Sequence, residues 1–147
     1  MAIAVGARAP EAPGVPSGPH AVVFYKVTCP TCQMAAPALE RFEEAYSGRL
    51  TGIGQDPAAE LSSFAARYRV TFPSEPDLPP YDVSNAYGIE HVPTMIVVGA
   101  DGRVADVVES WDRGGYNRAS ATLADLLDAD PAVISDPSDG LPEFRPG

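Results

Sequence analysis

The residues with the clearest chemistry are Cys29 and Cys32, the only two cysteines in the chain. The spacing places the second thiol about one helical turn after the first, so the two sulfurs can meet and form a disulfide. A thiol at the beginning of a helix lies among unpaired N–H groups at the positive end of the helix dipole, and both stabilise a thiolate. The pair therefore has the pattern of a redox-active dithiol, with Cys29 as the nucleophile and Cys32 as the resolving thiol.

Two other interpretations of this pair stay open at this point. Two cysteines are too few for a zinc site of four thiolates. A mixed site with His20 and His91 has enough ligands, but its spacings resemble no zinc finger. The cysteines can also be inert residues of a core. We expect dithiol chemistry, which requires no cofactor, and we expect no metal.

A strand and a helix must position these thiols. Residues 20–27 are short, almost continuously apolar and rich in β-branched and aromatic side chains, which is typical of a central strand buried on both faces. A helical pattern follows Cys32, with Thr28 as the expected N-cap and an expected kink at Pro37. The dithiol is therefore expected at a junction from strand to helix.

The rest of the chain continues the alternation of strands and helices. Residues 70–81 contain four prolines and are expected to form a loop, and Asp101-Gly102 indicates a hairpin turn. The other expected elements are strands at 50–55, 93–99 and 103–109, and helices at 57–68, 83–87 and 118–127, the last capped by Asn117. This order predicts an α/β fold in which a parallel crossover unit precedes an antiparallel hairpin and a covering helix.

Composition limits the class of protein. The 147 residues are enough for one domain, which we expect at 20–128, between an extended arm at 1–19 and an acidic, proline-containing tail at 129–147. The tail is expected to be a solvated cover or a loose end. Ten basic and 20 acidic residues give a net charge of −10, which argues against nucleic acid or an anionic membrane as a partner. No signal peptide or long apolar stretch is evident, so a cytoplasmic location is expected.

Residues 24–32, Phe-Tyr-Lys-Val-Thr-Cys-Pro-Thr-Cys, resemble the active-site segment of thioredoxin-like proteins. The resemblance is to the redoxin branch, which contains the cytochrome-maturation thioredoxins and the peroxiredoxins, and it continues through Val92-Pro93-Thr94 to cover about 20–128. It implies a thioredoxin-like fold, with a central mixed sheet flanked by helices. It also implies that Pro93 is a cis-proline facing the dithiol, and that Val92, Pro93 and Thr94 bind substrate.

The chain departs from this family where other groups assist the thiols. Val23 stands where thioredoxins have a buried acid, and Ala35 stands where the cytochrome-maturation type often has a glutamate, so no proton acceptor for Cys32 is evident. Lys26 stands where peroxiredoxins have a threonine. Lys26 and His91 are the candidate modulators of the Cys29 pKa, because a nearby positive charge favours a thiolate.

The predicted function is that of a thiol–disulfide oxidoreductase. Its partners would be a protein disulfide, or a small thiol or peroxide, and a reducing or oxidising partner protein. One alternative is a peroxiredoxin-like peroxidase, in which peroxide oxidises Cys29 to a sulfenic acid that Cys32 resolves. Another is a non-enzymatic module that senses redox state or binds one partner. Reduction of insulin distinguishes the first function from the other two, and consumption of peroxide distinguishes the second.

Overall fold

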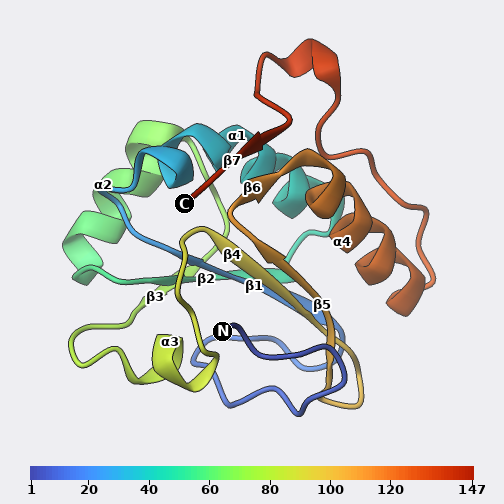
Figure 1. The fold of residues 1–147 in the computed structure, drawn as a ribbon, viewed down its shortest axis with the longest axis horizontal. Helices are drawn as coiled ribbons and strands as arrows, with labels where there is room; N and C mark the ends of the chain where they lie inside the picture. Colours follow the sequence, from blue (N-terminus) through green and yellow to red (C-terminus); the bar gives the residue numbers. More distant parts are fainter.

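The computed structural model describes all residues from Met1 to Gly147. A sheet of five strands, in the order β3-β2-β1-β4-β5, forms the centre of the molecule (Figure 1). The strands are β1 (His20–Tyr25), β2 (Leu50–Gly54), β3 (Ser74–Pro76), β4 (Thr94–Val98) and β5 (Val104–Glu109). β1 pairs with β2 in parallel and with β4 antiparallel, so the sheet is mixed as expected.

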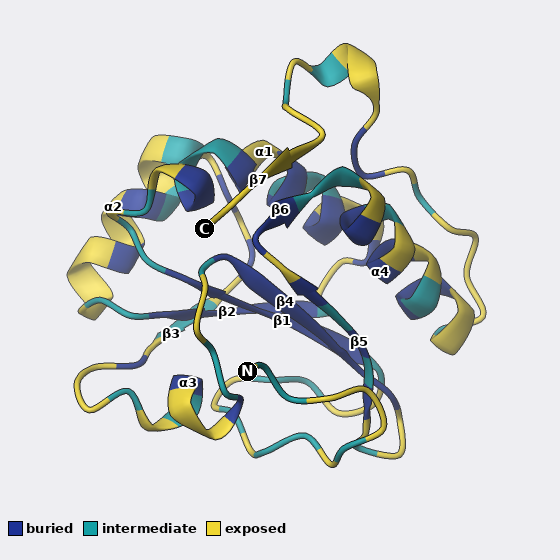
Figure 2. Ribbon diagram, in the orientation of Figure 1, coloured by how far each residue is buried: buried dark blue, intermediate teal, exposed yellow.

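Helices cover the two faces of the sheet unequally. α1 (Pro30–Ala45), α2 (Ala58–Tyr68) and α4 (Arg113–Leu126) cover one face, whereas α3 (Asp82–Ala86) and the segment 1–19 cover the other (Figure 1). All six residues of β1 are buried, because the strand lies in the middle of the sheet with a hydrophobic cluster on each side (Figure 2). This double burial explains the almost continuous apolar run in the sequence. None of the helices is both long and apolar enough to span a bilayer.

The structure differs from the sequence-based expectation at three elements. The N-cap of α1 is Cys29 and not Thr28, because the Cys29 sulfur accepts the hydrogen bond that a cap provides. α4 begins at Arg113 and not at residue 118, since Asp112 caps it by accepting from the N–H of Gly115 at 3.1 Å. The loop expected at 70–81 contains β3, which pairs with β2 in parallel at the edge of the sheet.

The arm at 1–19 contains no helix and packs against the rest of the protein. Backbone hydrogen bonds join Ile3 to Tyr87, Gly6 to Val104 and Ala9 to Gly102. Apolar side chains of the arm pack on the smaller of the two hydrophobic clusters. The arm therefore takes the place of a helix on this face of the sheet.

The chain after α4 folds back over the protein and is not a loose end. Ile134 is only 1% exposed and belongs to the main hydrophobic cluster. The short helix η1 (Pro137–Asp139) follows, and β7 (Phe144–Arg145) then pairs antiparallel with β6 (Trp111–Asp112). In Figure 1 this segment, drawn in red, returns to the side of the molecule that carries α1. The net negative charge of the tail did not indicate these contacts.

Candidate active site

The two cysteines lie where β1 leads into α1. The Cys29 sulfur accepts a hydrogen bond from the N–H of Cys32 at 3.3 Å, so this side chain caps the helix that carries its partner. Cys32, in the first turn of α1, is fully buried, whereas Cys29 is partly exposed. The arrangement presents the first thiol to a substrate and keeps the second behind it.

The surroundings separate the acidities of the two thiols. The pKa of Cys29 is lowered from 9.0 to about 6, mainly by a hydrogen bond from the Cys32 thiol and further by backbone N–H groups of Cys32 and Thr31, which outweigh the effect of burial. The pKa of Cys32 is raised, mainly by that same hydrogen bond and then by burial. A thiolate is the nucleophilic form of cysteine, so Cys29 is the group prepared for attack.

The loop before β4 faces the dithiol. The peptide bond between Val92 and Pro93 is cis. The protonated Cys29 thiol donates to the carbonyl of Val92 at 3.4 Å, and the hydroxyl of Thr94 donates to the carbonyl of His91 at 2.7 Å. Val92 therefore touches the nucleophile directly, whereas Thr94 orders the loop. Binding of substrate by these residues stays a prediction.

The two candidate modulators differ in how they lie relative to the dithiol. Lys26 acts through its backbone, whose hydrogen bond opposes the raised pKa of Cys32. The side chain of His91 is exposed. The positive charge that lowers the pKa of Cys29 is that of Arg145, which is distant in sequence and lies in β7. A role for the side-chain charges of Lys26 and His91 remains an expectation to be tested by mutation.

Sequence reasoning missed three groups around the dithiol. The hydroxyl of Thr31, between the cysteines, donates to the carbonyl of Pro146 at 2.7 Å, across 115 positions of sequence. The hydroxyl of Ser110 accepts from the N–H of Gly147 at 3.0 Å. The hydroxyl of Tyr116 is buried without a partner, and its pKa is raised by burial and to a lesser degree by Cys32. No local pattern marks these positions, because Thr31 and Ser110 bind residues distant in sequence and only the fold brings Tyr116 near Cys32.

The structure contains no group of three or more histidine, cysteine, aspartate or glutamate side chains placed to hold a metal ion.

The difference between the thiols leads to a direct prediction. Iodoacetamide should modify Cys29 of the reduced protein near neutral pH and leave Cys32 unmodified, because Cys29 is the partly exposed and ionised thiol. The alkylation rate should follow the Cys29 thiolate, with a midpoint at a pH of about 6. Peptide mapping of the labelled protein measures this selectivity. Faster labelling of Cys32 would reverse the roles of the two thiols.

Comparison with known proteins agrees with this fold. A model of the AhpC/TSA family matches residues 15–107. A comparison with curated protein sequences finds no match.

Solved structures with a similar fold include a secreted disulfide oxidoreductase of Mycobacterium tuberculosis homologous to E. coli DsbE. It is 22% identical with a TM-score of 0.61, over 74% of this chain and 82% of that one. DsbF of the same organism is 24% identical with a TM-score of 0.63, and the match covers 75% of this chain and 81% of DsbF. The thioredoxin domain of a thiol-disulfide oxidoreductase from Bacteroides vulgatus is 16% identical with a TM-score of 0.65, and the match covers 86% of this chain and 96% of that domain. Together with the mixed sheet and the Cys29–Cys32 pair, the family match confirms the resemblance to the redoxin branch: this chain is a member of the AhpC/TSA family with a thioredoxin-like fold.

Proposed function

We propose that the protein is a thiol–disulfide oxidoreductase that uses Cys29 and Cys32. The observation that carries this proposal is the asymmetry of the pair. One thiol is accessible with its pKa lowered to about 6, and the other is buried behind it with its pKa raised. An inert pair of core cysteines requires no such difference, whereas a nucleophile and a resolving thiol do.

In the first step the Cys29 thiolate attacks one sulfur of a substrate disulfide. A bond forms between the Cys29 sulfur and that sulfur, the substrate S–S bond breaks, and the other substrate sulfur leaves as a thiolate that takes a proton from water. Backbone N–H groups at the beginning of α1 stabilise the Cys29 thiolate before attack. The product is a mixed disulfide between Cys29 and the substrate.

In the second step Cys32 releases the substrate. The hydrogen bond to Cys29 is the main cause that raises the pKa of Cys32, and the negative charge of Cys29 raises it further. Both causes vanish once Cys29 is part of a mixed disulfide, so Cys32 loses its proton more easily at the moment when attack is required. The Cys32 sulfur then bonds to Cys29, the substrate leaves with the electron pair and a proton, and the protein has given two electrons to the substrate.

The similar proteins support the same chemistry, since two of the three named above are a disulfide oxidoreductase and a domain of a thiol-disulfide oxidoreductase. By analogy, we propose that protein thiols and disulfides are the substrates and that a separate dithiol partner completes the cycle. The direction of electron flow depends on the reduction potential of the pair.

Insulin turbidity tests this proposal. With dithiothreitol as the reductant, the protein should accelerate reduction of insulin, and Cys29→Ser should give the uncatalysed rate. Hydrogen peroxide in place of insulin should be consumed no faster by the wild type than by Cys29→Ser. Loss of peroxide without reduction of insulin would support the peroxidase alternative, and inactivity towards both would support a binding module.

A further inference from the structure

The last five residues of the chain cross the face of the dithiol. β7 pairs with β6, with Trp111 opposite Arg145 and Asp112 opposite Phe144. Beyond β7 the carbonyl of Pro146 accepts from the hydroxyl of Thr31 at 2.7 Å. Because Thr31 lies between the two cysteines, the segment 143–147 runs directly over the beginning of α1.

This segment ends against the loop that faces Cys29. A Cβ atom added to Gly147 would collide with the carbonyl of Val92, so the two backbones are in close contact. The same carbonyl lies 3.4 Å from the Cys29 sulfur. Arg145 is near enough for its charge to act on Cys29, and its guanidinium also contacts the Met34 sulfur at 3.8 Å. A peptide that approached Cys29 along Val92 would meet these residues.

We propose that residues 143–147 occupy, in the reduced protein, the surface on which an extended segment of a disulfide substrate binds, so that the tail competes with substrate within the same chain. The proposal rests on the proposed function. It assigns the tail a regulatory role and assigns Thr31, Ser110 and the backbone of Val92 to the binding surface.

The contacts that hold the tail would serve any extended peptide. The hydroxyls of Thr31 and Ser110 bind only backbone atoms of the tail, a carbonyl and an N–H respectively. Pairing along β6 also uses backbone atoms, which is how extended peptides add to a sheet edge. Gly147 has no side chain, and the side chains of 143–146 are exposed. The surface therefore recognises backbone conformation more than sequence.

Ser110 is built into this surface and does not belong to a flexible loop. It is only 6% exposed, and its N–H donates to the carbonyl of Pro93 at 2.8 Å. Its φ angle is +67°, in the left-handed region that non-glycine residues rarely adopt. Such conformations persist where the surroundings hold them, often at binding sites. The hydroxyl is thereby fixed beside the Val92–Pro93 loop, where it accepts from the tail.

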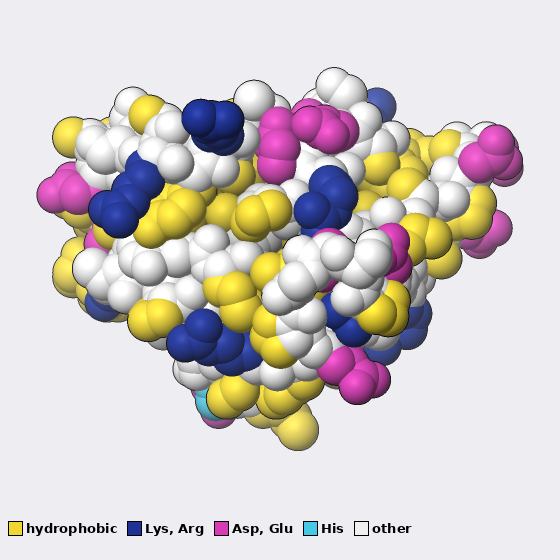
Figure 3. Space-filling model, turned by 90° about the horizontal axis from the view of Figure 1, so that it is seen from above, with side chains coloured by type: hydrophobic (Ala, Val, Ile, Leu, Met, Phe, Trp, Pro, Cys, Tyr) yellow, Lys and Arg dark blue, Asp and Glu magenta, His cyan; other side chains and the backbone are white.

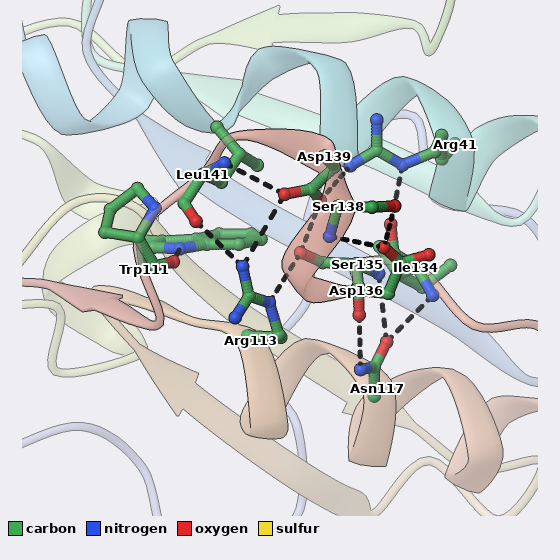
Figure 4. A network of polar contacts seen from close by, with 11 residues as sticks. Arg41, Trp111, Arg113, Asn117, Ile134, Ser135, Asp136, Ser138, Asp139 and Leu141 are labelled. Atoms are coloured by element: carbon green, nitrogen blue, oxygen red, sulfur yellow. Dashed lines mark hydrogen bonds and ion pairs between the residues drawn. The ribbon is translucent and has the colours of Figure 1, made fainter.

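Anchors upstream allow the tail to open without unfolding the protein. Side chains of α1, β6 and α4 hold the preceding segment 134–142 (Figure 4). They are Arg41, Trp111, Arg113 and Asn117. The last carbonyl held by a side chain of these elements is that of Pro142, which accepts from Trp111 at 2.6 Å. The backbone N–H of Arg113 donates to the next carbonyl, that of Glu143, at 2.9 Å. Only the exposed residues beyond Pro142 must then leave the site, and the anchor keeps their effective concentration at the site high.

The surrounding surface suits an extended polypeptide. Seen from the side that carries α1 and β7, hydrophobic side chains gather in a band across the middle of the face, with separate basic and acidic groups around it (Figure 3). A substrate segment that displaced the tail would gain apolar contact on this face in addition to backbone hydrogen bonds.

The test compares the intact chain with a chain that ends at Pro142. All five deleted residues are exposed and the four side-chain anchors remain, so the fold should persist, which circular dichroism checks. A tail that closes the site in about nine molecules of ten should lower the reaction of Cys29 with a bulky maleimide about tenfold, and truncation should remove this protection. Rates are compared at alkaline pH, where Cys29 is ionised in both proteins.

Arg145→Gln is the matched control, because it removes the charge and leaves the backbone contacts of the tail. It should move the midpoint of alkylation to higher pH, as truncation does, but it should keep the protection at alkaline pH. Equal alkaline rates in the intact and truncated proteins would overturn the proposal. This measurement requires no oxidoreductase activity, so its result is independent of the insulin assay.

Two further measurements identify the occupant. A synthetic peptide with the sequence of residues 141–147, added to the truncated protein, should restore protection. Protection of the intact protein should not depend on protein concentration, since the tail acts within its own chain. Protection that grows with concentration would assign the site to the tail of a second copy and contradict the proposal. If insulin is reduced, truncation should also lower the KM for insulin and, at alkaline pH where Cys29 is fully ionised, leave the rate with a small disulfide unchanged.

Discussion

Cys32→Ser should accumulate as a covalent complex with its substrates. In this variant Cys29 still forms the mixed disulfide, but a serine hydroxyl cannot attack the Cys29 sulfur and release the substrate. Incubated with intact, disulfide-bonded insulin or with a cell extract, Cys32→Ser should give complexes on non-reducing gels that disappear with dithiothreitol. Reduction of insulin by this variant should fall to the rate without enzyme.

Cys29→Ser is the control for this experiment, because it removes the nucleophile and leaves the buried thiol. It should form no complex, since Cys32 is fully buried and that burial still disfavours its thiolate. The double variant should behave like Cys29→Ser. Equal trapping by the two single variants would exclude a directional mechanism and indicate a passive pair of thiols.

The local part of the site could be predicted from the sequence. Strand β1 is recognisable because it is apolar throughout, and the Cys29–Cys32 spacing requires only one helical turn to bring the thiols together. Each of these depends on residues within a few positions of each other. The fold class followed from the order of such elements, because connection rules leave few arrangements.

The caps show where local reasoning was incomplete. Thr28 is a good N-cap residue, but the Cys29 sulfur takes that position, so the redox group is itself the cap. α4 was predicted to begin five residues late, because Gly114 and Gly115 are poor helix formers. Close packing requires a glycine at position 115, since a Cβ atom there would come within 2.6 Å of the Val108 side chain.

The tail could not be predicted, because no pattern in residues 129–147 indicates what they contact. Arg145 reaches the dithiol through a turn at η1 and a pairing with β6, and both depend on the finished fold. Composition suggested a solvated segment, but the acidic Asp139 accepts from Ser135 and pairs with Arg41 at 3.0 Å. A charged segment can thus be fixed when its charges meet partners on another element.

Trp111 connects the fold of the core to the position of this tail. Its ring is fully buried, lies 4.6 Å from the ring of Tyr116, and belongs to the same hydrophobic cluster as Cys32. Its Nε1–H donates to the carbonyl of Pro142, the last residue before the segment that crosses the active site. The backbone of Trp111 also pairs with that of Arg145. One side chain therefore supports the core and the tail at once.

Trp111→Ala should be the most destabilising single change in the core. Truncation of a large buried aromatic side chain costs about 3–5 kcal/mol, through lost burial and the cavity that remains. The tail should also detach from the active site, because the Pro142 carbonyl loses its donor. Denaturation with urea, followed by circular dichroism, measures the first effect, and maleimide labelling of Cys29 measures the second.

Trp111→Phe separates these two effects, because it keeps an aromatic ring in the core and removes only the N–H donor and part of the volume. It should cost less than Trp111→Ala, since loss of one partner of a buried hydrogen bond costs about 1–3 kcal/mol. Labelling of Cys29 by the bulky maleimide should nevertheless increase, because the anchor at Pro142 is lost in both variants. If Trp111→Phe leaves Cys29 as protected as in the wild type, the Trp111 hydrogen bond does not hold the tail, and its remaining contacts suffice, among them those with Thr31 and Ser110 and the pairing of β6 with β7.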